Sequence, residues 1–189
     1  DDGNMMLLAK VGTPAQQDHY LPRMSAAVDL WCQGWSEPNA GSDLAGVRSK
    51  ATRDDAAGGW VLSGQKTWTT RGAFSNYLFG LFRSDPASER HKGLTYFMVP
   101  LDAEGVTVRG FGRLDGDEGF AEVFFDDVFV PENHLVGGLN NGWAVANTTL
   151  AHERGTAFPF AGTVSRWPAA SSMTWSSSIR PDASVWMPR

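Results

Sequence analysis

The sequence QGWSEPNAGSDL, at residues 33–44, is followed by GQKTWTT at residues 64–70. We call these the first and second segments; both carry hydroxyl side chains and a tryptophan. In the first segment, Pro38 and Gly41 favour a turn, and Ser42 can cap exposed backbone donors. Glycine lets the backbone approach a pyrophosphate, and successive N–H groups supply partial positive charge without a lysine or arginine. The two segments together predict a cradle for a planar ligand that carries phosphate.

The second segment supplies the flat part of this predicted site. Trp68 offers a broad face for ring stacking, and Thr69 and Thr70 offer hydroxyl groups beside it. Each segment alone has a simpler explanation. The first can be an ordinary surface turn, and Trp68 can be a buried strand residue, because the chain contains eight tryptophans. It is the presence of both segments in one chain that favours ligand binding.

The middle of the chain has the pattern of a β-protein. Short runs rich in β-branched and aromatic residues are separated by Gly, Asp, Asn and Pro, which predicts antiparallel strands. No helical pattern lies between these runs, which argues against a Rossmann sheet. The expected fold class is therefore mainly β with flanking helices (α+β). The strands are expected at residues 28–35, 47–53, 60–66, 77–83, 94–100, 106–109 and 121–130.

Helical spacing at the two ends of this region suggests a division into domains. Apolar residues at helical spacing occupy 5–24, with breaks expected at Gly12–Pro14 and at Pro22, and a helical pattern returns after Asn141. The segment after 164 is crowded with Ser, Pro and Trp and has neither periodicity, so we expect it to be disordered. The predicted parts are the end of a helical domain (1–27), a central β-barrel (28–138), the start of a second helical domain (139–164) and an atypical tail (165–189).

Composition excludes several classes of function. The net charge of −5, without a basic stripe, argues against nucleic-acid binding, and we expect the basic residues 90–92 to form a solvated loop. The four histidines are scattered singly, so no metal site is expected. No apolar run is long enough to predict membrane insertion. The single cysteine, Cys32, excludes an intrachain disulfide and fits a reducing compartment, either the bacterial cytoplasm or the mitochondrial matrix.

In residue types and order, the two segments resemble the flavin-binding segments of acyl-CoA dehydrogenases. The resemblance continues through residues 76–100, DDVFVP at 126–131 and HERG at 152–155, and it covers roughly residues 13–162. It implies an antiparallel β-barrel middle domain of the acyl-CoA dehydrogenase type, with FAD as cofactor. The chain is shorter than such an enzyme, so we expect a truncated or frameshifted gene, or else a divergent tail.

The resemblance also implies roles for individual residues. Trp68 would lie along the isoalloxazine ring, Thr70 would donate to the edge of the ring, and Ser42 would lie near a phosphate or the thioester. The implied cofactor-binding residues are Gln33, Trp35, Ser36, Gly41, Ser42, Trp68, Thr69 and Thr70.

The implied reaction is the α,β-dehydrogenation of an acyl-CoA thioester. A carboxylate removes a proton next to the carbonyl while a hydride leaves the adjacent carbon. Some family members carry that carboxylate in a Glu-Arg pair on the helix after the barrel, which makes Glu153 the candidate base and Arg154 a candidate substrate contact. A structural ion pair on a helix surface explains these two residues equally well.

Two other functions remain open. The chain can be a catalytically incomplete relic that acts at most as a flavin-binding or structural barrel, or a β-barrel interaction module whose motifs are only turns. For the enzyme, the resemblance implies an electron-transfer flavoprotein as electron acceptor and a homodimer or homotetramer as the assembly.

Overall fold

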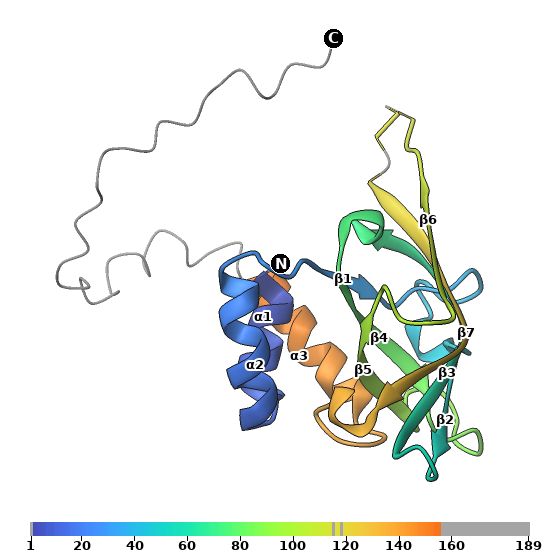
Figure 1. Ribbon diagram of the computed structural model, residues 1–189. Helices are drawn as coiled ribbons and strands as arrows, with labels where there is room; N and C mark the ends of the chain where they lie inside the picture. Colours follow the sequence, from blue (N-terminus) through green and yellow to red (C-terminus); the bar gives the residue numbers. More distant parts are fainter. Residues whose placement is uncertain (1, 115, 118, 156–189) are drawn as a thin grey trace, which may run out of the picture. The chain divides into compact units, whose positions relative to one another are not determined.

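The computed structural model describes residues 2–114, 116–117 and 119–155, and within it a twisted sheet lies beside helices from the two ends of the described chain (Figure 1). The fold class, mainly β with flanking helices, is confirmed. The helices are α1 (Asp2–Val11), α2 (Pro14–Ser25) and α3 (Gly142–Gly155), with short 3-10 turns at Leu44–Gly46, Gly72–Phe74 and Glu132–His134. The strands are β1 (Trp31–Gly34), β2 (Lys50–Asp54), β3 (Gly59–Thr70), β4 (Tyr77–Arg83), β5 (Leu94–Pro100), β6 (Val106–Phe111), β7 (Phe120–Pro131) and β8 (Leu135–Val136).

The predicted strands all form, and β4 and β5 have the predicted bounds. β3 continues beyond its predicted end to Thr70, because it keeps pairing with β7 across two register shifts. The second shift lies between Lys66 and Thr69, and within it Trp68 has a left-handed backbone, with a φ of 57°. β8 was not predicted, since a two-residue strand leaves no periodic pattern.

The sheet is mixed, which corrects the expectation that it is antiparallel throughout. The strands follow the order β6-β7-β3-β2-β4-β5-β8, and in the described part of the chain this path does not close into a barrel. β1 pairs with β4 in parallel over Trp31–Gly34, and Lys50 of β2 also pairs in parallel with Arg83 at the far end of β4. The long connection between β1 and β4 permits this arrangement, whereas a short hairpin would force an antiparallel pair.

One consequence of this pairing concerns the first segment. β1 and β2 share the same edge of β4, β1 along its beginning and β2 at its last residue. Residues 35–49 connect β1 to β2 and therefore leave the sheet at the gap between them. The end of β3 that continues past β2 carries the second segment. The topology thus brings the two segments to one place.

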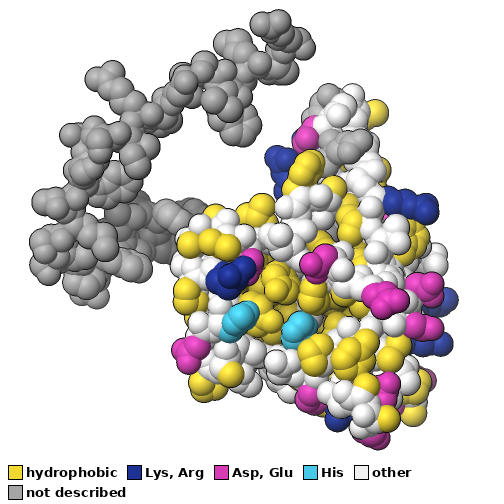
Figure 2. Space-filling model, viewed as in Figure 1, with side chains coloured by type: hydrophobic (Ala, Val, Ile, Leu, Met, Phe, Trp, Pro, Cys, Tyr) yellow, Lys and Arg dark blue, Asp and Glu magenta, His cyan; other side chains and the backbone are white. Residues whose placement is uncertain are grey.

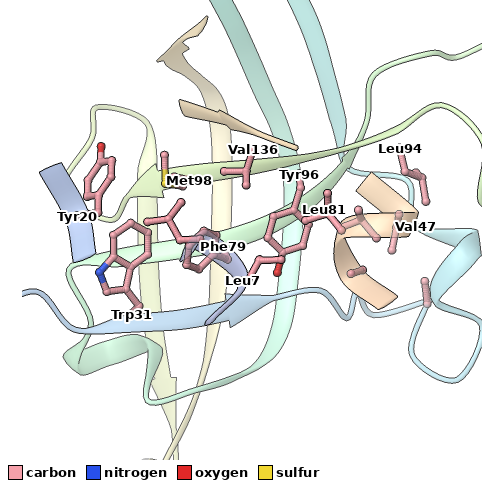
Figure 3. Close-up of a cluster of buried hydrophobic side chains, with 14 residues drawn as sticks. Leu7, Tyr20, Trp31, Val47, Phe79, Leu81, Leu94, Tyr96, Met98 and Val136 are labelled. Atoms are coloured by element: carbon pink, nitrogen blue, oxygen red, sulfur yellow. The ribbon is translucent and has the colours of Figure 1, made fainter. Parts of the chain in front are cut away.

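Strands β4 and β5 are buried on both faces, and their side chains alternate between two cores. One core lies between the sheet and the helices and contains Phe79, Leu81, Tyr96 and Met98 (Figure 3). The other lies on the opposite face of these strands and contains Leu78, Phe82, Phe97 and Val99. Strand β1 alternates in the same way, with Trp31 in the first core and Cys32 in the second.

Helix α2 is anchored to the sheet by polar contacts. Thr13 caps its first turn in a capping box with Gln16, which confirms the predicted break before Pro14. The side chain of Gln16 also donates to the carbonyl oxygens of Asn133 (2.7 Å) and Leu135 (2.8 Å). The break predicted at Pro22 is wrong, because α2 continues through this residue to Ser25.

His134 lies at the same junction, partly buried, with Nδ1 3.0 Å from the carbonyl oxygen of Met98 and Nε2 3.4 Å from the hydroxyl of Tyr20. Burial lowers the pKa of His134 below its ordinary value, an effect that the Met98 carbonyl opposes. The folded protein therefore favours the neutral ring, while the unfolded chain takes up a proton near pH 6.5. Full stability is expected above that pH.

We predict that the free energy of unfolding decreases as the pH falls below about 6.5, by at most about 1.4 kcal/mol per pH unit from this one proton. Urea unfolding of the wild type and of His134→Gln between pH 5 and 8 tests this. The difference in unfolding free energy between the two proteins should change with pH in that range. A constant difference would contradict the assignment to His134.

Candidate functional site

The first segment contains a tight turn whose tip is open to solvent. The N–H of Glu37 donates to the carbonyl of Ala40 at 2.8 Å, and the N–H of Ala40 donates back at 3.0 Å. Gly41 and Ser42, which follow, are exposed, and a Cβ atom added to Gly41 would meet nothing within 4 Å. The backbone here thus faces open space that a ligand can approach, as the cradle hypothesis requires.

The two segments are in direct contact. The N–H of Thr67 donates to the carbonyl of Ser36 at 2.9 Å, so the strand end of the second segment runs beside the start of the turn. Trp35 is oriented toward the interior, since its indole N–H donates to the Tyr96 hydroxyl at 2.8 Å and its ring packs on the core beneath the helices. The indole of Trp35 is therefore engaged by the protein itself.

A buried ion pair lies under this junction. Lys66 is fully buried, and its Nζ lies 2.8 Å from Oε1 of Glu37. Burial lowers the pKa of Lys66 to about 8, although Glu37 opposes this effect. Burial alone would raise the pKa of Glu37, but Lys66 and the N–H groups of Arg48 and Ser49 hold it below its ordinary value. Each partner thus favours the charged form of the other, against the effect of burial.

Trp68 is an exposed residue, not part of the core. Its side chain is 61% exposed, and its ring makes edge contacts with Phe111 and Phe120 at centroid distances of 5.3 and 5.6 Å. With 61% of the residue exposed, much of the indole remains accessible to a ligand. The bulge in β3 explains the exposure, because the register shift turns Trp68 out of the alternation between sheet faces.

The two threonines after Trp68 lie in different surroundings. Thr69 is fully buried, and its hydroxyl has no hydrogen-bond partner among the described residues. Thr69 as a whole is 0% exposed and pairs with Ala121 of β7, so it lies beneath the surface that a ligand could reach. Thr70 is exposed and lies, with Gln33, on the wall of a cleft of about 810 Å³.

This cleft lies between the helical N-terminal region and the edge of the sheet. Its apolar wall comes from Met5 and Met24 of the helices, Leu30 and Trp31 at the start of β1, and Phe74. Figure 2 shows that apolar side chains are exposed on the face of the molecule between the helices and the sheet. The volume is within the range of about 300–1,000 Å³ typical of small-molecule sites.

The predicted residues are thus distributed over neighbouring surfaces. Gln33 and Thr70 share the cleft, while Trp68 borders a separate hollow of about 580 Å³ lined by Phe111, Gly112, Arg113 and Leu114. Gly41 and Ser42 lie on the exposed turn, outside both. The exposed indole of Trp68, the exposed Thr70 and the uncrowded turn at Gly41 are thus each open to a ligand.

Two predicted residues cannot be placed in the same detail. Glu153 and Arg154 fall within the bounds of α3, in agreement with the predicted helix after the sheet, but their side chains lie outside the described part of the structure.

Among the described residues, no group of three or more acidic, histidine or cysteine side chains could hold a metal ion. No helix in the described residues is long and apolar enough to cross a membrane.

Glu37 and Lys66 both belong to the two segments, but local sequence patterns predicted no role for either residue. One signal was available: Lys66 is the only charged residue of the second segment, and the first segment has only Glu37 and Asp43. A charge in such a setting is usually exposed, so the sequence alone did not predict that the two side chains meet inside the protein.

Comparisons with known proteins agree with this architecture. A family model described as acyl-CoA dehydrogenase, middle domain, matches residues 32–128. The chain is 48% identical over 143 residues to acyl-CoA dehydrogenase FadE34 of Mycobacterium tuberculosis, covering 76% of this chain and 20% of that protein. It is 47% identical over 148 residues to acyl-CoA dehydrogenase IpdE1 of the same organism, covering 78% and 38%.

Solved structures give the same result. The structure described as Tcur3481-Tcur3483 steroid ACAD superposes with a TM-score of 0.76 at 29% identity, covering 88% of this chain and 47% of that one. The chain thus spans between a fifth and about half of the length of these matched proteins.

We predict that Trp68 contributes little to folding, because its ring is mostly exposed. Trp68→Ala should lower the free energy of unfolding by about 1 kcal/mol, through loss of its edge contacts. Trp60→Ala is the matched control: Trp60 is 4% exposed, and its replacement should cost about 3–5 kcal/mol. Urea unfolding of both variants measures the difference. Equal losses would mean that Trp68 is a core residue.

Proposed function

The chain belongs to the acyl-CoA dehydrogenase family, and we propose that it is the flavin-binding middle part of an enzyme that oxidises an acyl-CoA thioester between its α and β carbons. The observation that carries this proposal is the direct contact of the two segments, with the exposed indole of Trp68 next to their junction. The family membership supports the reaction class, and the open surfaces around the junction support a flavin as cofactor.

We infer that FAD is held mainly by the surfaces described above. Trp68 would stack on the flavin ring, Thr70 would donate to the ring edge, and the backbone of Gly41 and Ser42 would receive the phosphates. Gln33, Trp35, Ser36 and Thr69 complete the proposed set of binding residues, with Trp35 and Thr69 acting from positions where their side chains are already packed. When bound, FAD supplies the hydride acceptor that the reaction needs.

For the chemistry, we propose Glu153 as the general base. A carboxylate at this position would remove the proton next to the thioester carbonyl, and Arg154 would contact the substrate. The cleft beside Gln33 and Thr70 supports the binding of an acyl group, because half of the residues that line it are apolar. Positioning the acyl chain in this cleft would orient the two carbons that react.

The proposed enzyme would work with partners that the family implies. We propose an electron-transfer flavoprotein as the electron acceptor and a homodimer or homotetramer as the assembly. The buried thiol of Cys32 would be compatible with a reducing compartment such as the cytoplasm.

We predict that the 189-residue chain, purified with excess FAD and then desalted, retains the visible absorbance of bound flavin. Trp68→Ala should weaken FAD binding about tenfold or more, because about 1.4 kcal/mol of stacking energy corresponds to that factor. Ser36→Ala should weaken binding less, since its backbone contact with Thr67 is unchanged.

Folding controls make this experiment decisive. Circular dichroism should show that Trp68→Ala remains folded, so that a loss of flavin reports on the site. A folded wild type that retains no flavin at saturating FAD would overturn the proposal for this chain. Retained flavin without turnover would identify it as a flavin-binding domain that does not catalyse the reaction alone.

A separate prediction concerns Glu153. If it is the base, Glu153→Gln should bind FAD as tightly as the wild type but lose at least about 100-fold of the rate of flavin bleaching by an acyl-CoA, within the range for general base catalysis. Stopped-flow absorbance measures that rate. Equal bleaching rates in the two proteins would exclude Glu153 as the base.

A further inference from the structure

We propose that the buried ion pair of Glu37 and Lys66 is the positioning device of the candidate flavin site: it fixes the first segment against the second and thereby sets the affinity for the cofactor. This inference rests on the proposed function for its cofactor, but its structural part can be tested without one. Neither residue is exposed enough to touch a ligand with its charged group, so both would act through the backbone that they hold.

Glu37 organises the turn from its centre. Its backbone closes the turn through the reciprocal hydrogen bonds with Ala40, and its carboxylate accepts from the N–H groups of Arg48 (2.6 Å) and Ser49 (2.9 Å). These two N–H groups lie immediately before β2, so one side chain ties both ends of the loop between β1 and β2. The loop carries Gly41 and Ser42 between those fixed ends.

Lys66 ties this loop to the sheet. Its ammonium group donates to Oε1 of Glu37 (2.8 Å), to the carbonyl of Leu81 in β4 (2.6 Å) and to the carbonyl of Trp35 (3.4 Å). It also lies over the ring of Phe82, 5.0 Å from the centroid. One cation thus joins the first segment, the second segment and a central strand, two residues before the exposed indole of Trp68.

An apolar pair of similar volume could fill the same space but could not replace these contacts. Removing two charges from water costs about as much free energy as their mutual attraction supplies. A buried ion pair therefore adds little net stability. It does require each partner to be met by hydrogen bonds in fixed directions, and here the protein supplies four such bonds besides the pair's own contact. The pair therefore specifies geometry more than it adds stability.

The test uses the full 189-residue chain with Glu37→Gln, Lys66→Met and the double variant. Each single change leaves a buried polar or charged group without its partner and should lower the melting temperature, whereas the double variant removes both charges and should recover most of it. The positioning role predicts that the recovery does not extend to FAD, whose dissociation constant should stay at least tenfold above that of the wild type. Arg53→Met is the control, because it removes a cation from an exposed pair with Glu132 on another part of the sheet.

Amide hydrogen exchange is measured in parallel at Thr67 and Ser49, whose N–H groups join the two segments and the loop. In the folded double variant, both amides should exchange at least tenfold faster than in the wild type, while amides of β4 and β5 keep their protection. Arg53→Met should change neither FAD affinity nor this exchange.

The outcomes separate this inference from the proposed function. If the wild type binds FAD and the double variant binds it within twofold, the positioning role is overturned. If the wild type binds no FAD, the proposed function of this chain fails, and the exchange rates alone decide about the pair. Faster exchange at Thr67 and Ser49 then supports it, and unchanged exchange overturns it.

Discussion

The contact between the Glu37 carboxylate and the Lys66 ammonium group is the constraint on which the arrangement of the site depends. It lies inside the protein, where a charge without a partner would cost far more than the pair returns. The loop from β1 to β2, the end of β3 and the middle of β4 all supply groups to it, so none of the three can shift alone. The ion pair thereby fixes the surface above it, which has an open glycine turn on one side and an exposed indole on the other.

The topology of the sheet makes that contact possible. β1 enters parallel to β4 and occupies only the first part of its edge, which leaves room for the connecting loop before β2 begins. β3 extends past β2 into the same region, and the bulge there turns Trp68 outward. In an all-antiparallel meander, β2 would lie between β1 and β3, and neither β1 nor β2 would share the edge of β4. The departure from the expected pairing is thus what assembles the candidate site.

Much of the fold follows from local sequence patterns, and the candidate site follows only in part. The runs at 77–83 and 94–100 are recognisable because apolar residues fill nearly every position and the strands end at turn residues. Turn, hydroxyl and aromatic residues together predicted a ligand-binding role for the two segments, and that role stays a prediction. Their sequences did not show that Thr69 is buried or that Trp35 is committed to Tyr96, because those contacts depend on strands more than twenty residues away.

By itself, then, the sequence determined the order of helices and strands and the family. It also indicated which residues are candidates for a flavin site. Only the tertiary structure decided which of those residues are available to a ligand and what holds them in place. The physical reason is that periodicity and turn propensity report on the local backbone, whereas strand pairing and the burial of charge are set by distant parts of the chain. Lys66 illustrates the difference, since nothing near it in sequence indicates that its partner is Glu37.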